Sequence, residues 1–446
     1  MLLLAALLIA CHSTPKDSAT EGDAPVSNLT VTVHEEVATI LRVSWTQDQD
    51  AEAGWLEFWV EGEEIQLSPE TPRPVGPQSE VVLGVPADTG VTLRLVERVD
   101  GEEKATATLV QRTGPLPEGL PIPTLESWDP TLTHAAPWML GSVDAGDLWY
   151  SGPYWVWILD RQGRIVWYRE VPDHRCTMFP RVSRDGTHIA WEESTWFTFE
   201  TTTLPSLERT TLDGTWQSPL EVPDLVYAWD ELDDGSYLYD YIEGYEDNGI
   251  SHLYPDGTTA RLWSCSEWLG ETAEMWACDT NTVNWSPARD TVLWSMYAVG
   301  TVVELDRQTG QVRHAWGRHG TEAVLPAEAA FDMQHYPNWT DDGTLLVSTH
   351  VLETDDVQQA REFTLDESTG TLSQVWNYQG EDAYAIYAGE AARLDNGNTL
   401  VNYGTRGLIR EITSDGQIAW SALFPGLQLV GHDTLVTDLY ALNRGL

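Results

Sequence analysis

FDMQHYPNWTDDGTLLV, from Phe331 to Val347, is the stretch that best shows how this chain folds. Apolar and polar residues alternate on both sides of an Asp342-Gly343 pair, and Asp-Gly favours a tight turn between antiparallel strands. The stretch is therefore predicted to form a β-hairpin. Variants of this hairpin recur along most of the chain, but only this copy carries a Gln-His pair, ending at His335, in its first strand. The shared pattern predicts the fold, and the difference marks a candidate site.

A second kind of hairpin repeats from about residue 125 onward. Its pattern is x-x-D-x-x-G-x-φ-x-W or a shortened form, where φ is apolar, and six copies follow one another at roughly fifty residues. Their aspartates are Asp160, Asp213, Asp256, Asp306, Asp366 and Asp415. Turns of the first kind lie between them, at Gly186, Gly235, Asp290, Gly343 and Gly397, with a weaker one at Val143–Gly146. Each repeat therefore contains two hairpins, which make four antiparallel strands.

These repeats predict the architecture. A four-stranded unit cannot bury both of its faces alone, so we expect six units to pack radially as a six-bladed β-propeller over residues 125–446. The repeated tryptophans, such as Trp167 and Trp316, are expected to fill the core between blades rather than to form a ligand cage. The inner strands and the loops that enter them surround the central channel, where a site is expected.

The segment Val26–Arg112 predicts a separate small β domain. It contains about seven short alternating strands and an early tryptophan, Trp45, which indicates a β-sandwich and resembles a fibronectin type III or immunoglobulin-like module. The proline-rich segment 113–124 is expected to be a stiff linker. The whole chain is thus predicted to be all-β, with a small sandwich before the propeller.

The first residues resemble a bacterial lipoprotein signal. Met1 to Ala10 is an apolar run without charge, and it leads to Cys11, which would become the lipidated first residue. Ten residues are too few to cross a bilayer. Residues 12–25 are polar and are expected to be a tether. We therefore expect an exported protein, held by its lipid alone in the bacterial cell envelope, in the periplasm or at the cell surface.

Charge and cysteine content limit the partners and cofactors. The net charge is −46, and only Lys16 and Lys104 among the 24 basic residues are lysines, so we exclude nucleic acid as a partner. The sequence has neither a calcium-loop motif nor a zinc-like Cys/His spacing, and no metal or cofactor is expected. If Cys11 is acylated, three cysteines remain, of which Cys265 and Cys278 lie close in sequence and form a disulfide candidate. The sequence does not indicate an oligomeric state.

Several motifs in the propeller region resemble those of one known family, and they occur in the same order. They are Asn281–Val283 followed by Thr309–Gly317, Gln334-His335 before an Asp-Gly hairpin, Arg361 before a Leu-Asp turn, Val375–Tyr378, Ala392–Gly404 and Ile409–Trp420. In this order they resemble the arylsulfotransferases, bacterial aryl-sulfate sulfotransferases that use no nucleotide sulfate donor. The resemblance covers about three hundred residues, and a small sandwich ahead of the propeller is also found among relatives.

This resemblance implies transfer of a sulfuryl group from an aryl sulfate to a phenol through a sulfated histidine. Such a site needs a neutral imidazole as nucleophile, and cations or hydrogen-bond donors for the charged oxygens. His335 is expected to attack or to protonate the leaving phenolate, and Arg361 to grip the same sulfate with its planar fork. Asn281 and Asp279 are expected to bind substrate, although Asp279 stands where family members often carry a histidine, and a carboxylate repels sulfate. His432 is a further candidate for the nucleophile.

Two functions stay open at this point. The first is an exported arylsulfotransferase that acts on small phenols, and the second is a non-catalytic surface propeller that binds an anionic or aromatic ligand or a protein. Three or more histidines and arginines converging on the channel would favour the enzyme. An inward-facing Asp279 would favour the binding protein.

Overall fold

The computed structural model describes residues 24–147, 149–172, 175–195, 204–243, 247–270, 277–351, 357–385, 387–426 and 428–445, and the backbone of residues 20–21. The chain divides into two compact units, Met1–Leu116 and Pro117–Leu446. Their boundary falls within the proline-rich segment 113–124. Cys11 and the signal-like segment before it lie outside the described residues, so the lipid anchor stays a prediction.

The first unit consists of two sheets with a buried core. One sheet has the order β2-β3-β7, and the other has β4 and β8 at its centre. Its strands are β1 (Thr20–Glu21), β2 (Val26–Val33), β3 (Leu41–Gln47), β4 (Ala51–Val60), β5 (Gln66–Leu67), β6 (Thr71–Arg73), β7 (Gly76–Val82), β8 (Gly90–Val99), β9 (Glu102–Ala105) and β10 (Leu109–Arg112). Every second residue of β3 is buried, and Gln47 at its end donates to Glu97 of the other sheet (3.1 Å). The period-two pattern thus places one face of β3 in the core. The likeness to fibronectin type III stays a prediction.

The second unit contains six sheets, mainly antiparallel, within the residues that the structure describes. Four of them consist of β36 (Leu429–Val436), β12 (Trp138–Asp144), β13 (Tyr154–Asp160) and β14 (Ile165–Glu170); β15 (Arg181–Val182), β16 (Ile189–Glu193), β17 (Ser206–Thr210) and β18 (Leu220–Glu221); β19 (Leu225–Glu231), β20 (Tyr237–Glu243), β21 (Asp247–Leu253) and β22 (Thr259–Ser264); and β23 (Thr280–Ser286), β24 (Thr291–Met296), β25 (Thr301–Asp306) and β26 (Val312–Gly317).

Two of the six sheets have five strands. They consist of β28 (His335–Trp339), β29 (Leu345–Val351), β30 (Val357–Asp366), β31 (Thr371–Tyr384) and β27 (Val324–Leu325); and of β32 (Glu390–Arg393), β33 (Thr399–Asn402), β34 (Leu408–Ile412), β35 (Ile418–Leu423) and β11 (Thr124–Trp128). The short helices are α1 (Cys265–Leu269) and the 3-10 turns η2 (Tyr297–Val299), η3 (Ala327–Ala329), η4 (Gly404–Arg406) and η5 (Ala441–Asn443).

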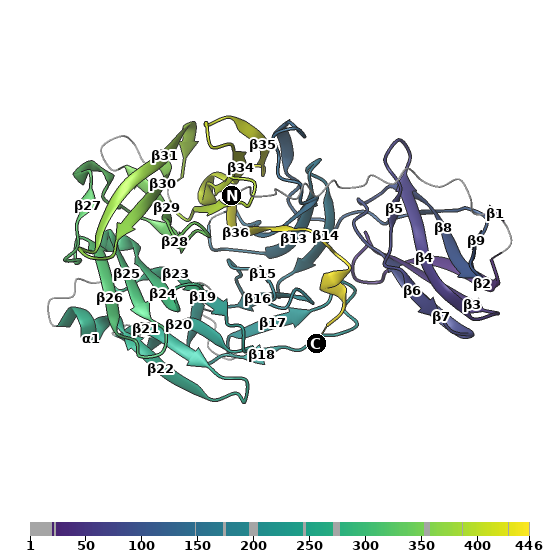
Figure 1. Ribbon diagram of the computed structural model, residues 1–446, viewed down its shortest axis with the longest axis horizontal. Helices are drawn as coiled ribbons and strands as arrows, with labels where there is room; N and C mark the ends of the chain where they lie inside the picture. The colour runs from purple at the N-terminus through teal and green to yellow at the C-terminus, as the bar shows by residue number, and fades with distance from the viewer. Residues whose placement is uncertain are drawn as a thin grey trace, which may run out of the picture. The chain divides into compact units, whose positions relative to one another are not determined.

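The sheets of the second unit follow one another around a common centre (Figure 1). Their first strands are in contact from β19 to β23, β28 and β32, and β15 contacts β36. The start and the end of the unit are joined by two strand pairs, β12 with β36 and β11 with β35. The Trp420 indole N–H, in the last sheet, donates to the Arg161 carbonyl between β13 and β14 (2.8 Å). The arrangement is all-β and propeller-like.

Several of the repeated tryptophans link their sheet to the next one. The indole N–H groups of Trp167, Trp316 and Trp376 donate to the carbonyls of Leu212 (2.8 Å), Gly370 (2.7 Å) and Ser414 (3.2 Å). Each acceptor lies in the turn of the repeated hairpin in the following sheet. Trp167 and Trp316 are also buried, so these side chains stabilise the core between sheets while their one polar group is satisfied.

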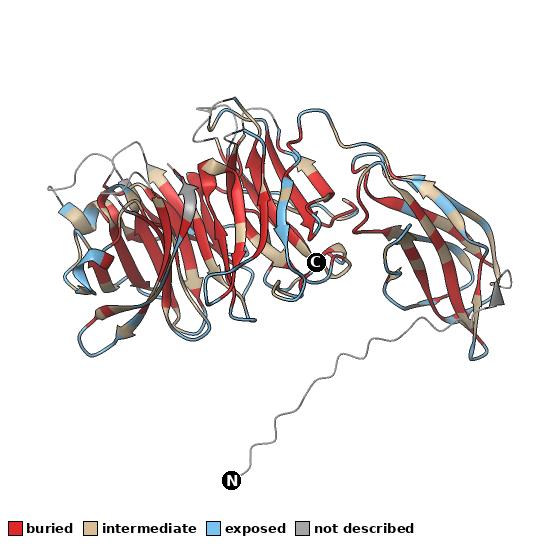
Figure 2. Cartoon of the chain, turned by 90° about the horizontal axis from the view of Figure 1, so that it is seen from above, coloured by how far each residue is buried: buried red, intermediate tan, exposed pale blue. Residues whose placement is uncertain are grey.

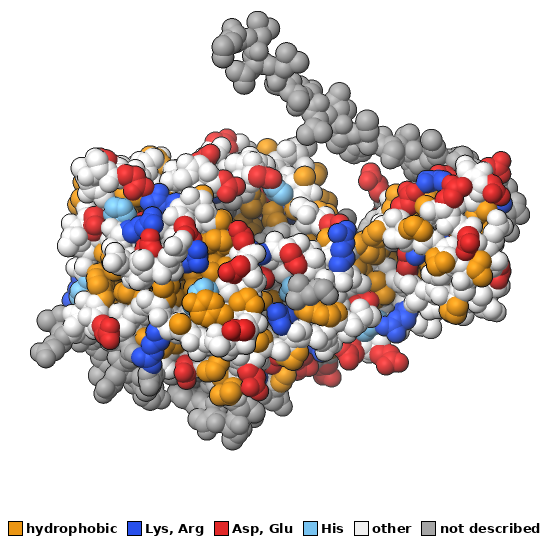
Figure 3. Space-filling model, turned by 60° about the horizontal axis from the view of Figure 1, so that its bottom comes forward, with side chains coloured by type: hydrophobic (Ala, Val, Ile, Leu, Met, Phe, Trp, Pro, Cys, Tyr) orange, Lys and Arg blue, Asp and Glu red, His pale blue; other side chains and the backbone are white. Residues whose placement is uncertain are grey.

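Burial follows the strands in both units, and the exposed residues lie mostly in the turns (Figure 2). On the face seen in Figure 3, acidic side chains are scattered over the surface and outnumber the basic ones, as the net charge of −46 requires. None of the helices in the described ranges is both long and apolar enough to span a membrane.

Candidate functional site

A cavity of about 360 Å³ lies among the first strands of the second unit and the loops that lead into them. Its wall is mainly aromatic, with Tyr150, Phe179, Tyr227, Tyr297, Tyr336 and Tyr387. The polar side chains in the wall are Asp279, Asn281, His335, Glu390, Asn402 and His432. No arginine or lysine is among the described residues that line it. The cavity therefore offers aromatic faces, two imidazoles and two carboxyl groups to a ligand.

The structure brings together three of the four residues predicted to bind or transform substrate. His335, Asp279 and Asn281 all line the cavity, His335 from β28, Asn281 from β23 and Asp279 from the position directly before β23. His432, the further candidate, lines the same cavity from β36. Arg361 is not part of this wall.

A bulge after His335 shapes one side of the cavity. The pairing of β28 with β29 is irregular there, and Tyr336 has a φ of 50°. The Tyr336 N–H donates to Thr282 Oγ1 in the neighbouring sheet (3.0 Å), and the Asn281 amide donates to the Gln334 carbonyl (3.0 Å). Because these bonds join β23 to β28, the side chains of both strands keep fixed positions in the wall.

His335 is a neutral imidazole whose two nitrogens both have partners. Nδ1 lies 2.9 Å from the Met333 carbonyl, and Nε2 lies 3.1 Å from the Ala388 N–H. A carbonyl only accepts and an N–H only donates, so these partners place the proton on Nδ1. Burial and the neighbouring His350 lower the pKa of His335 to about 3. Nε2 therefore carries no proton, and its lone pair accepts a hydrogen bond from the Ala388 N–H.

His432 forms a pair with Glu390 across β36 and β32. Its Nδ1 lies 2.8 Å from Glu390 Oε2, and its ring stacks against Tyr336 (4.9 Å between centroids) and Phe179 (6.1 Å). Burial lowers the pKa of His432 well below its usual value and raises the pKa of Glu390 to about 8. When Glu390 ionises, its carboxylate accepts from the Nδ1–H, and the Nε2 lone pair stays available for chemistry.

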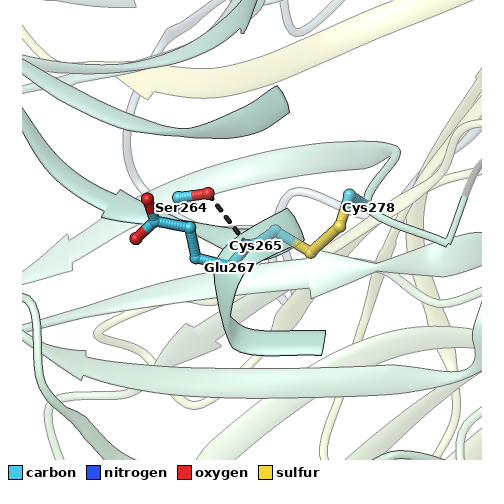
Figure 4. The surroundings of a disulfide bond; sticks show 4 residues. All are labelled: Ser264, Cys265, Glu267 and Cys278. Atoms are coloured by element: carbon cyan, nitrogen blue, oxygen red, sulfur yellow. Dashed lines mark hydrogen bonds between the residues drawn. A yellow bond between two sulfur atoms is a disulfide. The ribbon is translucent and has the colours of Figure 1, made fainter. Parts of the chain in front are cut away.

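Asp279 enters the cavity directly after a disulfide. Cys278 is bonded to Cys265, with 5.7 Å between their Cα atoms, and this bond ties the segment before β23 to helix α1 (Figure 4). Ser264 Oγ caps that helix by accepting from the Glu267 N–H (3.1 Å). The pair that the sequence left as a candidate is thus bonded in the structure, and it anchors the residue next to Asp279.

Arg361 lies away from the cavity, in contrast to its expected role. Its guanidinium donates to the side chain of Gln359 (3.0 Å) and to the carbonyls of Glu328 (3.0 Å) and Ala330 (3.2 Å). It lies in β30, which is separated by β29 from β28, the strand that supplies His335 to the cavity wall. Arg361 is 7% exposed and holds the turn η3 in place, so His335 and Arg361 do not face one sulfate here.

A second cavity lies behind the first one along the same strands. Tyr336, Glu390 and His432 line both, and the second adds residues further along the first strands, including Arg181 and Asp230. The Arg181 guanidinium donates to the Asn284 side chain (3.2 Å) and lies 3.6 Å from Asp230. Burial has the largest effect on the pKa of His432 and lowers it, and the positive charge of Arg181 lowers it further. Burial raises the pKa of Glu390, and the charge of Arg181 opposes this increase. Arg181 thus acts on the His432–Glu390 pair from behind.

Sequence reasoning did not identify Glu390 or Arg181. Neither lies in a motif of the family resemblance, and Glu390 stands two residues before one. A usable signal was present, because both are charged residues in the first strand of a repeat, where the sheet is expected to be buried. A charge in such a position needs a partner or a function.

Residues 265–422 match the family model described as Arylsulfotransferase (ASST). This range contains Asp279, Asn281, His335 and Glu390, while His432 and Arg181 lie outside it. None of the curated proteins matches the chain.

Several solved structures are similar in fold. They include a protein of unknown function from Bacteroides caccae (14% identity, 67% of this chain and 98% of that chain, TM-score 0.46), virginiamycin B lyase from Staphylococcus aureus (12%, 67% and 100%, 0.40) and a streptogramin B lyase (15%, 67% and 86%, 0.39). Likenesses at this level indicate no function for this chain.

Proposed function

We propose that this protein is an arylsulfotransferase-like enzyme that moves a sulfuryl group from an aryl sulfate to a phenol, with His432 as the nucleophile. The observation that carries this proposal is the His432–Glu390 pair in a tyrosine-lined cavity, part of whose wall lies in the region that matches the arylsulfotransferase family. A neutral imidazole held through Nδ1 by a carboxylate is oriented for attack through Nε2. We take the six sheets as the six blades of a closed propeller around this site.

The aromatic wall suits the ring of either substrate. A phenyl group can pack against the tyrosine faces and against Phe179, since aromatic pairs at such distances are attractive. With the ring held there, the sulfate group reaches toward His432 at the floor that the two cavities share. The remaining N–H of the Asn281 amide can donate to a sulfate oxygen.

The reaction proceeds in two steps. His432 Nε2 attacks the sulfur, the N–S bond forms, and the S–O bond to the aryl group breaks with its electron pair leaving on the phenolate, which then takes up a proton from water. The acceptor phenol next gives its proton to water, its oxygen attacks the sulfur, and the N–S bond breaks to return the lone pair to His432. Arg181 behind the ring and the ionised Glu390 beside it set the charge that His432 carries in both steps.

His335 has a different role in this proposal. Because the Ala388 N–H already uses its Nε2 lone pair, His335 supports the loop that carries Ala388 and Glu390. Its neutral ring also packs on Tyr297 (5.6 Å between centroids) and so shapes the wall. We therefore assign His335 as a positioning residue and His432 as the catalytic one.

The test is turnover of 4-nitrophenyl sulfate with phenol as acceptor, followed by release of 4-nitrophenol. We expect activity in the wild type and a loss on the order of a thousandfold in His432→Ala, because the nucleophile is removed. His335→Ala should lose less, and His34→Ala in the first unit should lose nothing. Mass spectrometry of a quenched digest should find the sulfuryl group on the peptide with His432. An inactive wild type, or a fully active His432→Ala, would refute the proposal.

We also propose that the protein is exported and anchored by a lipid on Cys11. The support is the apolar run before Cys11 and the Cys265–Cys278 disulfide, since such bonds persist in oxidising compartments. Cys11→Ser should leave the protein unprocessed and remove it from the membrane fraction. Unchanged processing and fractionation would contradict the anchor.

A further inference from the structure

Asp279 is a carboxylate in the cavity wall without a cation to balance it. Its one hydrogen bond among the described residues comes from the Tyr297 hydroxyl (3.1 Å), and none of the described arginines or lysines pairs with it. It is partly buried, and burial raises its pKa. A carboxylate that loses water on folding and gains no cation is poorly compensated, so a positively charged ligand would stabilise it.

Tyrosines surround this carboxylate. Tyr150, Tyr227 and Tyr297 all line the cavity, and the negative charge of Asp279 adds to the effect of burial in raising the pKa of each. The hydroxyl of Tyr227 donates to the carbonyl of Thr280, the residue after Asp279, which holds that ring beside the carboxylate. The faces of aromatic rings attract organic cations, and a neighbouring carboxylate strengthens the attraction.

A metal ion does not fit this position. No group of three or more His, Cys, Asp or Glu side chains in the described part of the chain could hold one. The oxygens near Asp279 come from tyrosine hydroxyls, which are weak ligands when neutral, and burial keeps these tyrosines neutral. The aromatic surroundings instead suit a cation that is large and partly apolar.

We propose that the cavity binds aromatic ligands that carry a protonated amine, with the ammonium held by Asp279 among the side chains of Tyr150, Tyr227 and Tyr297. This inference rests on the cavity of the proposed function and names its preferred acceptor as a phenol with a cationic side chain. The ring then lies along the aromatic wall and the ammonium end takes the Asp279 side. Binding of such a ligand requires no sulfuryl transfer.

The test compares three phenols that differ only in the charge of the group opposite the hydroxyl. They are 4-(2-aminoethyl)phenol, 4-(2-hydroxyethyl)phenol and 4-hydroxyphenylacetate, measured by titration calorimetry without any sulfate donor. We expect the amine to bind on the order of 10- to 100-fold more tightly than the neutral phenol, because one charge-assisted hydrogen bond is gained. The carboxylate should bind most weakly. The preference should weaken as the pH falls and Asp279 takes up a proton.

Two variants locate the effect. Asp279→Asn keeps the shape and removes the charge, so it should bring the amine and the neutral phenol to equal affinity, and Asp279→His should turn the preference toward 4-hydroxyphenylacetate. Asp234→Asn, in an exposed turn outside the cavity, is the control and should bind as the wild type does. Equal wild-type affinities, or a preference that survives Asp279→Asn, would overturn the inference. Because binding is measured without a donor, an enzyme that fails to transfer sulfate can still confirm it, and an active enzyme can still refute it.

Discussion

The two cavities of the second unit share three side chains but differ in charge. The first has tyrosines and Asp279 and, among its described lining residues, no arginine or lysine, whereas the second has Arg181 and Arg184 together with acidic partners. The wall that the two cavities share contains the hydrogen-bonded pair of His432 and Glu390. The aromatic side chains thus lie on one side of His432, and the positively charged Arg181 lies on the other side. In the proposed reaction, a ligand enters on the aromatic side, and the Arg181 cation acts from the other side.

Removal of the cation behind His432 should produce the largest effect. Arg181→Met should lower kcat for 4-nitrophenyl sulfate by about 100- to 1,000-fold, as loss of one donor to a developing charge does elsewhere. Its affinity for phenol in the first cavity should change little. Asp230→Asn, which removes the partner but keeps the cation, is the matched control. If Arg181→Met retains wild-type kcat, the second cavity plays no part in the chemistry.

Loss of the disulfide should affect both the stability of the protein and the wall of the first cavity. We expect the double variant Cys265→Ser/Cys278→Ser to lose about 3 kcal/mol in the free energy of unfolding, because the bond closes a short loop. The amine ligand should also bind more weakly, since Asp279 follows Cys278. Chemical denaturation and calorimetry measure the two effects. A variant with unchanged affinity for the amine would show that β23 keeps Asp279 in place without the bond.

Titration of Glu390 should give opposite pH trends for activity and stability. Glu390 must ionise to hold the Nδ1–H of His432, so kcat/KM should rise about tenfold per pH unit up to about 8, the pKa of Glu390. Folded Glu390 keeps a proton that the unfolded chain releases near its usual value of 4.5. The stability that this proton contributes is present below that value and is lost as the pH rises through 8.

The control for this pH prediction is Glu390→Gln, which cannot titrate. It should show low activity with a flat profile in this range, and its free energy of unfolding should lose the corresponding slope. Activity that falls between pH 6 and 8 in the wild type would mean that the protonated form of Glu390 is the active one.

Arg361 provides the smallest effect on chemistry and a sharp contrast with Arg181. Arg361→Met should lower the free energy of unfolding by about 2 kcal/mol, because it leaves two backbone carbonyls and Gln359 without their donor. Its kcat should stay within about twofold of the wild type, because Arg361 does not line the cavity and substitutions at separate sites usually have independent effects. A hundredfold loss of kcat with normal stability would return Arg361 to the active site.

The sequence predicted local features well because they depend on neighbouring residues. The Asp-Gly turns, the alternation in the strands and the contacts of Trp167 and Trp316 all follow from short patterns that repeat. The motif around His335 also pointed to a residue of the cavity. A pattern of this kind does not depend on how the strands are placed relative to one another.

The rest of the site depends on contacts between distant segments. The bond between His432 and Glu390 spans 42 residues, and the one between Asn281 and Gln334 spans 53. Arg361 was expected at the channel from its place in the third strand of a repeat and from its family motif, but the structure places it two strands away from β28 and outside the cavity wall. Arg181 lies in a two-residue strand with no motif at all. These positions become visible only when the sheets are assembled.

The pairing of β36 with β12 brings Val436 opposite Trp138 and therefore joins segments that are made at very different times. Contacts of such long range form late in folding, after the local hairpins. His432 lies on β36, so a nascent chain with five completed sheets already has the wall with His335 and Asp279 but has no His432–Glu390 pair. Under the proposed function, reactivity toward an aryl sulfate should consequently arise only when β36 pairs with β12. If the chain is exported as proposed, this order would keep His432 from meeting Glu390 before translocation is complete.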